Sequence, residues 1–368
     1  MEEEAPTGGA GIRDVARAAG VSISTVSRAL NFKVGGGAIS QGTVDRVRVV
    51  ARQLNYRPNT WARSLRTAQT KAIGAIAFDL SHPFAAELLQ VVCTACEARG
   101  YHVLVGTAEY DSSEAWVLSE LLSPDRVDGV ILIGDTLLHA SGREDEISEA
   151  MARLLAVHPH VVTVASRPSL AGESSITVDN AAGVTLGLEH LASLGHARIA
   201  HVMDGYHADS WEDNQRTRTY RRFIESHRLS YDPALEVRVG SRDLEAARQA
   251  LGPLLSLPNP PTALFVNNDL AAITMLKAAL LSGVRVPEDL SLVGFDDIAY
   301  AALCTPGLTT VHQPIDAMGT YAANLLLDTI GGTQSDEPLD GRGRTVVFPP
   351  TLTLRQSCAP AHTNRSEP

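Results

Sequence analysis

The stretch IRDVARAAGVSISTVSRALN, residues 12–31, decides the fold of the N-terminal part of this chain. Its first half carries apolar residues at three- and four-residue steps, which form one face of a short helix: Ile12, Val15, Ala16 and Ala19. Gly20 interrupts this spacing, because glycine readily adopts the left-handed conformation that ends a helix. Ser22 is a good N-cap for a second helix that runs to about Asn31. Two short helices joined by such a turn predict a helix-turn-helix, whose second helix can enter the major groove of DNA.

The charge around this motif favours DNA binding over the alternative, in which two amphipathic helices belong to an ordinary helical bundle. Residues 11–70 hold ten Lys or Arg against two Asp, a formal charge of +8. The whole chain carries −11, so the remaining residues carry −19. A basic block in an acidic protein is the electrostatic signature of a surface that binds phosphate.

A third helix is expected to complete the N-terminal domain. Ser40 can cap a helix over 41–54, and the glycine-rich loop Gly35–Gly37 separates it from the second helix. Its inner face carries four apolar residues: Val44, Val47, Ala51 and Leu54. We therefore expect a disordered tail over 1–10, a three-helix headpiece over 11–57 and a linker over 58–69.

Length and composition limit the class of protein. A chain of 368 residues with 44% hydrophobic residues can bury sizeable cores in two or three units. No apolar run reaches the roughly 20 residues of a membrane span, and the acidic start MEEEAPTGGAG does not read as a signal peptide. Four cysteines in such a chain do not make a disulfide framework. We expect a cytoplasmic protein without membrane contact.

From Lys71 onward, apolar strands alternate with helices, which predicts an α/β core of doubly wound parallel sheets. The expected strands are 72–80, 101–109, 127–135, 160–167 and 175–180, then 198–205, 235–240, 262–269 and 290–297. The expected helices are 83–99, 112–122, 181–194, 214–228, 243–255 and 270–282. Two such cycles predict two subdomains with ligand sites at the carboxyl ends of strands.

The last part of the core, within 70–356, is divided between these subdomains. We expect 309–330 to return to the first subdomain and 345–354 to add a final strand to the second. The first subdomain then covers about 71–177 and 311–334, and the second about 178–310 and 341–356. Residues 357–368 are expected to form a tail.

The chain resembles the LacI/GalR family of bacterial transcription regulators. The headpiece pattern D-V-A-x-x-A-G-V-S-x-x-T-V-S-R-x-L-N is matched by Asp14–Ala16, Ala19–Ser22, Thr25–Arg28 and Leu30–Asn31. Core motifs also match: Leu194–His196, Val266–Asp269, Val286–Asp289, Val293–Asp297 and Leu308–Val311. The resemblance extends over nearly all of residues 11–356 and implies a core like that of periplasmic sugar-binding proteins. Two departures are Gly11 in place of the family threonine before the first helix and the Gly35–Gly37 insertion.

The resemblance implies the residues that meet DNA. Ile23, Ser24 and Arg28 match base-reading positions, and arginine can donate two hydrogen bonds to guanine. Leu65, in a hinge helix ordered on DNA, matches a leucine that wedges into the minor groove. Phosphate contacts are implied for Ser22, Thr25, Ser27 and Asn31, and hinge positions for Pro58, Asn59, Ala62 and Arg63. The alternatives are helix capping for the hydroxyl residues and a plain flexible linker for the hinge.

The resemblance also implies a small-molecule effector between the subdomains. Candidate contacts are Asp79, Phe84, Asp135 and Arg167 on the first subdomain, and Arg216, Arg242, Asn268 and Asp296 on the second. Arg216 lies in R-T-R-T-Y, similar to the family's R-x-x-G-Y, with Thr219 in place of glycine. Arg242 stands where the family has a stacking aromatic ring, which favours an acidic or phosphorylated sugar. The alternative for Asp79, Asp135 and Arg242 is a salt bridge at the subdomain boundary.

Neither catalysis nor a metal or cofactor is predicted. The pair Cys93 and Cys96 falls in the middle of a helix, without the second pair of ligands that a zinc site needs. The sequence contains no Walker loop, no G-x-S-x-G and no H-E-x-x-H. An enzyme is therefore the weaker hypothesis.

The expected function is that of a homodimeric repressor of carbohydrate-metabolism genes. Two headpieces would read a pseudo-palindromic operator in double-stranded DNA, and a sugar-like effector would control that binding. The C-terminal tail has no leucine heptads, so a dimer is preferred to a tetramer. The alternatives are an activator or a co-repressor-dependent regulator of the same family, and a sugar-binding protein without DNA function.

Overall fold

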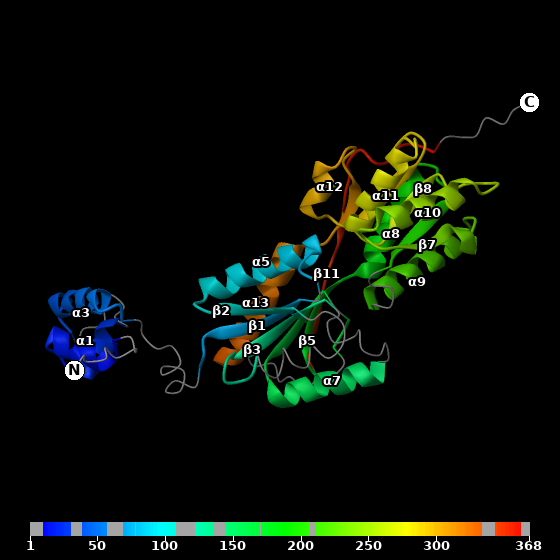
Figure 1. Cartoon of the computed structure of the whole chain (residues 1–368). Coiled ribbons are helices and arrows are strands. Elements are labelled where there is room, and N and C mark those ends of the chain that lie inside the picture. Colours follow the sequence, from blue (N-terminus) through cyan, green and yellow to red (C-terminus); the bar gives the residue numbers. More distant parts are fainter. Residues whose placement is uncertain are drawn as a thin grey trace, which may run out of the picture. The chain divides into compact units, whose positions relative to one another are not determined.

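The computed structural model divides into two compact units, Met1–Thr70 and Lys71–Pro368 (Figure 1). It describes residues 10–30, 39–56, 69–77, 79–107, 122–134, 144–165, 167–169, 171–205, 211–332 and 343–361, with the backbone alone at 144–147 and 211–214. The expected helix at 112–122, the Gly35–Gly37 loop, the hinge residues and the tail at 1–9 lie outside the described residues.

The first unit is a three-helix headpiece of α1 (Ile12–Ala19), α2 (Ile23–Leu30) and α3 (Gln41–Gln53). Its core contains the apolar residues that the helical spacing predicts, with Val15, Val26 and Val44 fully buried. Gly20 takes φ +66° at the end of α1, as the turn requires. Gly11 has no side chain to cap α1, but its N–H donates to Asp14 Oδ2 at 2.9 Å, so the aspartate occupies that end of the helix.

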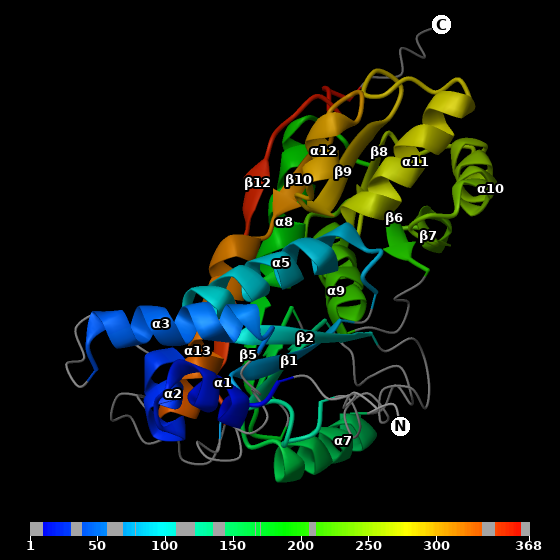
Figure 2. The ribbon, with the colours of Figure 1, turned by 60° about the vertical axis from the view of Figure 1, so that its left-hand side comes forward.

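The first subdomain of the second unit contains an all-parallel sheet in the order β11-β5-β4-β3-β1-β2. Its strands are β1 (Ala72–Ala77), β2 (His102–Thr107), β3 (Gly129–Ile133), β4 (Val161–Val164), β5 (Ser174–Val178) and β11 (Thr345–Phe348). Helices α5 (Pro83–Ala98) and α13 (Ile315–Gly331) cover one face, and α7 (Glu144–Val157) covers the other (Figure 2). On β3, Ile131 and Ile133 face α5 and α13, whereas Val130 and Leu132 face α7, as strand alternation demands.

The second subdomain contains a sheet in the order β12-β10-β9-β8-β6-β7, parallel except for the edge strand β12. Its strands are β6 (Ile199–Asp204), β7 (Glu236–Val239), β8 (Ala263–Val266), β9 (Ser291–Asp296), β10 (Thr309–His312) and β12 (Thr351–Thr353). Its helices are α8 (Asn180–Ser193), α9 (Trp211–Ser226), α10 (Leu244–Leu255), α11 (Asp269–Leu281) and α12 (Ala299–Leu303), with a short 3-10 turn at Pro233–Leu235. The predicted fold class, a headpiece followed by two doubly wound subdomains, is confirmed.

Three details of the expected division were wrong. β10 lies in the second sheet, so only α13 of the 309–330 stretch returns to the first subdomain. Residues 345–354 form two strands, because Pro349 and Pro350 lack the N–H groups needed to continue a ladder, and β11 joins the first sheet while β12 joins the second. The expected tail at 357–368 begins later, since Ser357 is fully buried and accepts a 2.8 Å hydrogen bond from the Thr309 N–H.

Candidate DNA-binding surface and effector cleft

The outer face of α2 presents the residues expected to read bases. Ile23 is 46% exposed, and Ser24 and Arg28 are exposed as well, whereas Val26 and Ala29 on the same helix are fully buried. Arg28 is steadied by a long hydrogen bond of 3.3 Å from its Nε to the Ser24 carbonyl oxygen. A large apolar side chain, Ile23, and a guanidinium, Arg28, are therefore both exposed on α2, outside the part of the helix that is buried in the headpiece core.

The hydroxyl residues at the start of α2 act as a cap. The Thr25 N–H donates to Ser22 Oγ at 3.1 Å, and Ser22 Oγ also lies 2.8 Å from the hydroxyls of Ser24 and Thr25. Capping was the alternative to phosphate contact, but the two are compatible because a helix N-terminus also attracts anions. Phosphate contact by Ser22, Thr25 and the half-buried Ser27 stays a prediction. Several other predicted DNA residues lie outside the described part of the chain: Asn31, Pro58, Asn59, Ala62, Arg63 and Leu65.

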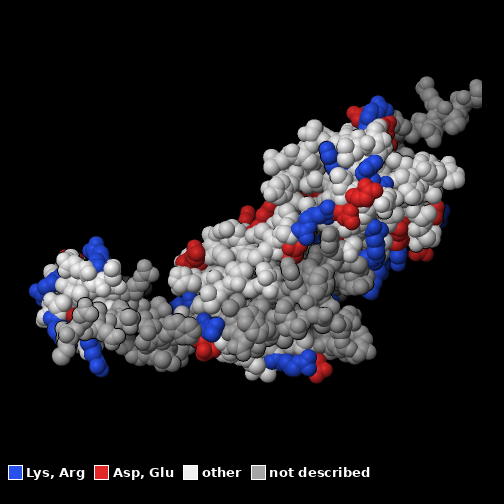
Figure 3. Space-filling model, in the orientation of Figure 1, with Lys and Arg blue, Asp and Glu red and all other residues white. Residues whose placement is uncertain are grey.

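Charge on the described headpiece is strongly basic. Six exposed arginines surround its core, namely Arg13, Arg17, Arg28, Arg46, Arg48 and Arg52, against the exposed Asp14 and Asp45. Figure 3 shows blue side chains gathered on this unit, with little red among them. The local positive field predicted from the sequence is therefore carried by solvent-facing side chains.

Arg216 is the hub of a buried polar cluster in the second subdomain. Only 5% of this α9 residue is exposed, and its Nε donates to Asn180 Oδ1 at 2.8 Å. Its Nη1 donates to the backbone oxygen of Asn267 and lies 3.9 Å from Asp296 Oδ1. The guanidinium carbon lies 3.7 Å from the centre of the Phe295 ring, which fixes the plane of the group.

Asp296 ends β9 beside this cluster and is 3% exposed. Its Oδ1 accepts a 2.8 Å hydrogen bond from Gln313 Nε2. Burial raises the pKa of Asp296 to about 7, although Arg216 and the Gln313 hydrogen bond pull in the opposite direction. The predicted effector residues Arg216 and Asp296 are thus brought together at the carboxyl end of the strand.

Asn268 joins the cluster from the loop that follows β8. Its Nδ2 donates to Asp204 Oδ2 at 2.9 Å, and its Oδ1 accepts from the Ala271 N–H at 2.8 Å, which caps α11. Asp204, at the end of β6, is 2% exposed. The asparagine therefore positions a buried carboxylate in addition to starting a helix.

Asp79 and Arg242 meet each other across the boundary between the subdomains. Arg242 Nη2 lies 3.0 Å from Asp79 Oδ2, and Arg242 also donates to the Ser81 hydroxyl. Partial burial opposes ionisation of Asp79, but hydrogen bonds from Ser81 and the charge of Arg242 bring its pKa below the ordinary value. The salt bridge weighed from the sequence is present in this state of the protein.

This pair should couple weakly in a double-mutant cycle. With side chains 43% and 27% exposed, the Arg242–Asp79 pair should give a coupling free energy of about 0.2–1 kcal/mol between Arg242→Ala and Asp79→Ala. Chemical denaturation of the four proteins measures it. Strict additivity of the two losses would mean that the ion pair is not formed in solution.

Three predicted effector residues remain: Phe84, Arg167 and Asp135. Phe84 is half-buried near the start of α5 and packs against the main core. Arg167 follows β4, is 9% exposed, and its carbonyl oxygen accepts from the Ser175 hydroxyl at 2.6 Å. Asp135 lies outside the described residues.

Sequence reasoning missed four polar residues of this region: Asn180, Asp204, Gln313 and Glu87. Asp204 and Gln313 stand at or just after the ends of β6 and β10, where parallel sheets place ligand groups, so strand position was an available signal. Asn180 similarly follows β5 and starts α8. Glu87 lies within α5, and its spacing carries no signal of a site.

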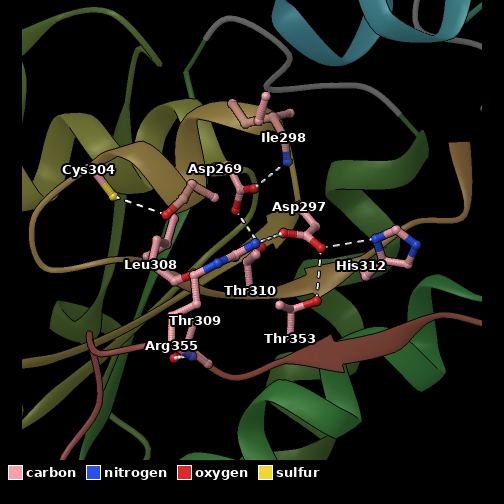
Figure 4. A network of polar contacts seen from close by, with 12 residues as sticks. Asp269, Asp297, Ile298, Cys304, Leu308, Thr309, Thr310, His312, Thr353 and Arg355 are labelled. Carbon is pink, nitrogen blue, oxygen red and sulfur yellow. Dashed lines mark hydrogen bonds and ion pairs between the residues drawn. The ribbon is translucent and has the colours of Figure 1, made fainter.

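A second network fixes the backbone next to Asp296 (Figure 4). Asp297 accepts hydrogen bonds from Arg355 Nη2 at 2.6 Å and the Thr353 hydroxyl at 2.8 Å, and it lies 3.0 Å from His312 Nδ1. Asp269, which is fully buried, accepts from the Thr310 hydroxyl and the Ile298 N–H, and burial keeps its pKa well above the ordinary value. Because Arg355 and Thr353 follow β11, the last described segment of the chain holds the site in place.

The described residues offer neither a metal site nor a membrane helix. Among them, no group of three or more His, Cys, Asp or Glu is arranged to hold a metal ion. None of the helices in that part of the chain is long and apolar enough to cross a bilayer. Cys96 is fully buried in α5, and burial raises the pKa of its thiol to about 11, which disfavours the reactive thiolate.

Known proteins share both the headpiece and the core of this chain. Residues 11–59 match the model described as bacterial regulatory proteins, lacI family, and residues 188–358 match a periplasmic binding protein-like domain. The chain is 32% identical to the HTH-type transcriptional regulator DegA of Bacillus subtilis (strain 168), over 96% of this chain and 99% of that protein. It is 33% identical to the ribose operon repressor of Escherichia coli (strain K12), over 87% and 92% of the two chains.

A solved structure of the lac repressor dimer, bound to operator and the anti-inducer ONPF, is similar along its whole length. The TM-score is 0.79 with 25% identity, and the match covers 96% of this chain and all of that one. The similarity therefore includes the headpiece as well as both subdomains.

Proposed function

Because this chain belongs to the lacI family of bacterial regulatory proteins, and is therefore a DNA-binding transcription regulator and not an enzyme, we propose that it is a repressor controlled by a small sugar-like effector. The observation that carries the proposal is that one chain contains both an exposed face on α2 and a buried polar cluster around Arg216. The first suits base edges, and the second suits a polar small molecule at the carboxyl ends of strands.

The relatives support both halves of this proposal. One relative is named as a ribose operon repressor, and the lac repressor was solved with operator and an anti-inducer. In this chain, closure of the two subdomains around a ligand would change the spacing of the two hinge segments, and the ligand shifts DNA affinity only if it binds one state more tightly. We place the regulator in the cytoplasm, where its operator DNA lies.

We also propose a homodimer. Helices α11 and α12 expose four large apolar side chains: Leu280, Leu281, Tyr300 and Leu303, the last of them 75% exposed. Tyr300 and Leu303 lie one turn apart on α12, adjacent large exposed apolar residues are typical of an interaction surface, and the lac repressor match is a dimer. A two-fold pair of headpieces would read a pseudo-palindromic operator.

Footprinting on the DNA upstream of the protein's own gene, combined with a transcription assay, tests the proposal. A protected pseudo-palindrome over a promoter, with lower transcription when the protein is present, is the expected result. Higher transcription from the protected promoter would favour an activator, and protection only with added ligand would favour a co-repressor. If the protein protects no DNA sequence, the repressor role is contradicted and only ligand binding remains of the proposed function.

Leu65→Ala tests the hinge role. Removing the Leu65 side chain should weaken operator binding by about 1–3 kcal/mol more than it weakens binding to random DNA. The reason is that an apolar wedge acts only on a site that is bent at its centre. Gel shifts on operator and scrambled duplexes at one salt concentration measure the two losses. Equal losses of affinity for both duplexes would contradict the wedge role of Leu65 and favour a plain linker.

A further inference from the structure

Lys71 is the residue at which the second compact unit begins, because the boundary between the two units falls between Thr70 and Lys71. It stands one position before β1, whose pairing with β2 starts at Ala72 and whose pairing with β3 starts at Ile73. Its backbone has φ +56°, a left-handed conformation that is unfavourable for a residue with a side chain. Such a conformation persists only where the surrounding groups determine it.

Groups at the starts of both neighbouring strands hold Lys71 in this conformation. Its N–H donates to Asp128 Oδ2 at 3.0 Å, and its carbonyl oxygen accepts from the His102 N–H at 2.9 Å. Its Nζ donates to the Tyr101 hydroxyl at 3.0 Å and lies 4.3 Å from the centre of that ring. Tyr101 is only 6% exposed, and the Asp128 N–H donates to the Ala72 carbonyl oxygen at 2.8 Å. These contacts of Lys71 with Asp128, His102 and Tyr101 form the Lys71 anchor.

The Lys71 anchor sets the direction in which the chain leaves the core toward the headpiece. The expected linker over 58–69 ends just before it. An operator complex fixes both ends of this linker, and each residue that must be ordered on binding lowers the binding constant by a factor of about 5–30. A residue that the core already holds in one conformation does not add to that loss.

We propose that Lys71 is a positioning residue for operator binding, which fixes the start of the linker so that the two hinge segments of a dimer meet over the operator centre. The proposal rests on the proposed homodimer and on the hinge role of Leu65, and it deepens both. Two linkers must leave their cores in defined directions before the hinge segments can pair on a pseudo-palindrome. Random DNA, which is held by contacts between headpiece arginines and phosphates, does not require that geometry.

Two substitutions of Asp128 that remove the same charge test the anchor in the full-length protein. Asp128→Ala removes the acceptor of the Lys71 N–H, whereas Asp128→Asn retains an amide oxygen that can accept this hydrogen bond. Gel shifts at one salt concentration compare a duplex obtained by binding-site selection with a scrambled duplex. Asp128→Ala should weaken operator binding at least about fivefold and random binding by less than about twofold. Asp128→Asn should stay within about twofold of the wild type on both duplexes.

Three further variants separate positioning from charge and from stability. Asp125→Ala removes an exposed carboxylate of the same loop, which accepts from the Ser123 hydroxyl, and should leave both affinities within about twofold of the wild type. Ile131→Val shortens a fully buried side chain of β3 and should leave the ratio of the two affinities unchanged. Tyr101→Phe removes the acceptor of the Lys71 ammonium but keeps the ring, so operator affinity should fall only about two- to threefold.

Hydrogen exchange provides a readout that does not involve DNA. The Lys71 amide should exchange faster in Asp128→Ala than in the wild type, because it loses its hydrogen-bond acceptor. In Asp128→Asn it should exchange nearly as slowly as in the wild type. Mass spectrometry of a peptide that contains residues 69–77 measures the difference.

The role of Lys71 and the proposed function fail in different ways. An unchanged operator affinity of Asp128→Ala, equal losses on both duplexes, or the same loss from Asp128→Asn would each overturn the role of Lys71 alone. Unchanged exchange in Asp128→Ala would overturn it too, since Asp128 would then not hold the Lys71 N–H. A wild type that selects no preferred duplex would overturn the proposed function and the role of Lys71 together.

Discussion

Replacing Arg216 with Ala should lower the free energy of unfolding by about 3–5 kcal/mol, the loss typical of removing one partner from a buried ion pair. The substitution leaves Asp296 without its nearest positive charge and Asn180 and the Asn267 carbonyl without their donor. It also removes the group stacked on Phe295. Urea denaturation followed by circular dichroism measures the loss, and effector response should disappear with it.

The matched control for Arg216 is Arg248→Ala. Arg248 pairs with Glu245 at 3.6 Å, but both side chains are more than half exposed, so its removal should change stability by less than about 0.5 kcal/mol. Similar losses of unfolding free energy from Arg216→Ala and Arg248→Ala would contradict the role of Arg216 as the centre of the buried polar cluster.

The cost of removing Arg216 should also depend on pH. The pKa of Asp296 is about 7 against an ordinary 3.8, so the folded chain holds a proton that the unfolded chain releases. The contribution of this group to stability therefore falls as the pH rises from about 4 to about 7. Below about pH 7 the Asp296 carboxyl of the folded chain is neutral and gains less from its guanidinium, so Arg216→Ala should cost less at about pH 5 than at about pH 8.

Replacing Arg28 with Ala should weaken operator binding by about 1–3 kcal/mol and relax base preference at one position in each half-site. Arg28 is exposed on α2, as are Ile23 and Ser24, and the base-reading role assigned to it depends on that exposure. Binding-site selection on the wild type and the variant would show the change as a flattened position in the sequence logo.

Arg52→Ala on α3 is the control for Arg28. It removes the same charge from the headpiece without touching α2, so any loss should be similar on operator and random DNA and should fall with added salt. If the base preference of the operator site is unchanged after Arg28→Ala, Arg28 does not read a base.

The headpiece was predicted well because each of its helices carries its own pattern. Val15, Val26 and Val44 recur with a helical period, and Gly20 stands where α1 ends. Membership of the regulator family followed from the same stretch and is confirmed by the relatives. Local sequence is sufficient when burial, capping and turn conformation all agree over a few residues.

The core was predicted less completely because strand order and ion pairing are non-local. Alternating strands and helices indicated the doubly wound class, yet nothing local assigns β11 to one sheet and β12 to the other. The Arg242–Asp79 contact joins residues 163 positions apart, so the sequence could only leave a ligand contact and a salt bridge as alternatives. Helices α7 and α12 were missed.

The split of the last strands between the two sheets also has a consequence for protein synthesis. A ribosome makes the N-terminal part first, and domains generally fold as they emerge. Here β11, β12 and the buried Ser357 all come from the final described segment, 343–361. Both sheets therefore lack an edge strand until residues 345–353 have been made, whereas the headpiece needs only residues before Thr70. The part that binds DNA can fold long before the part that controls it.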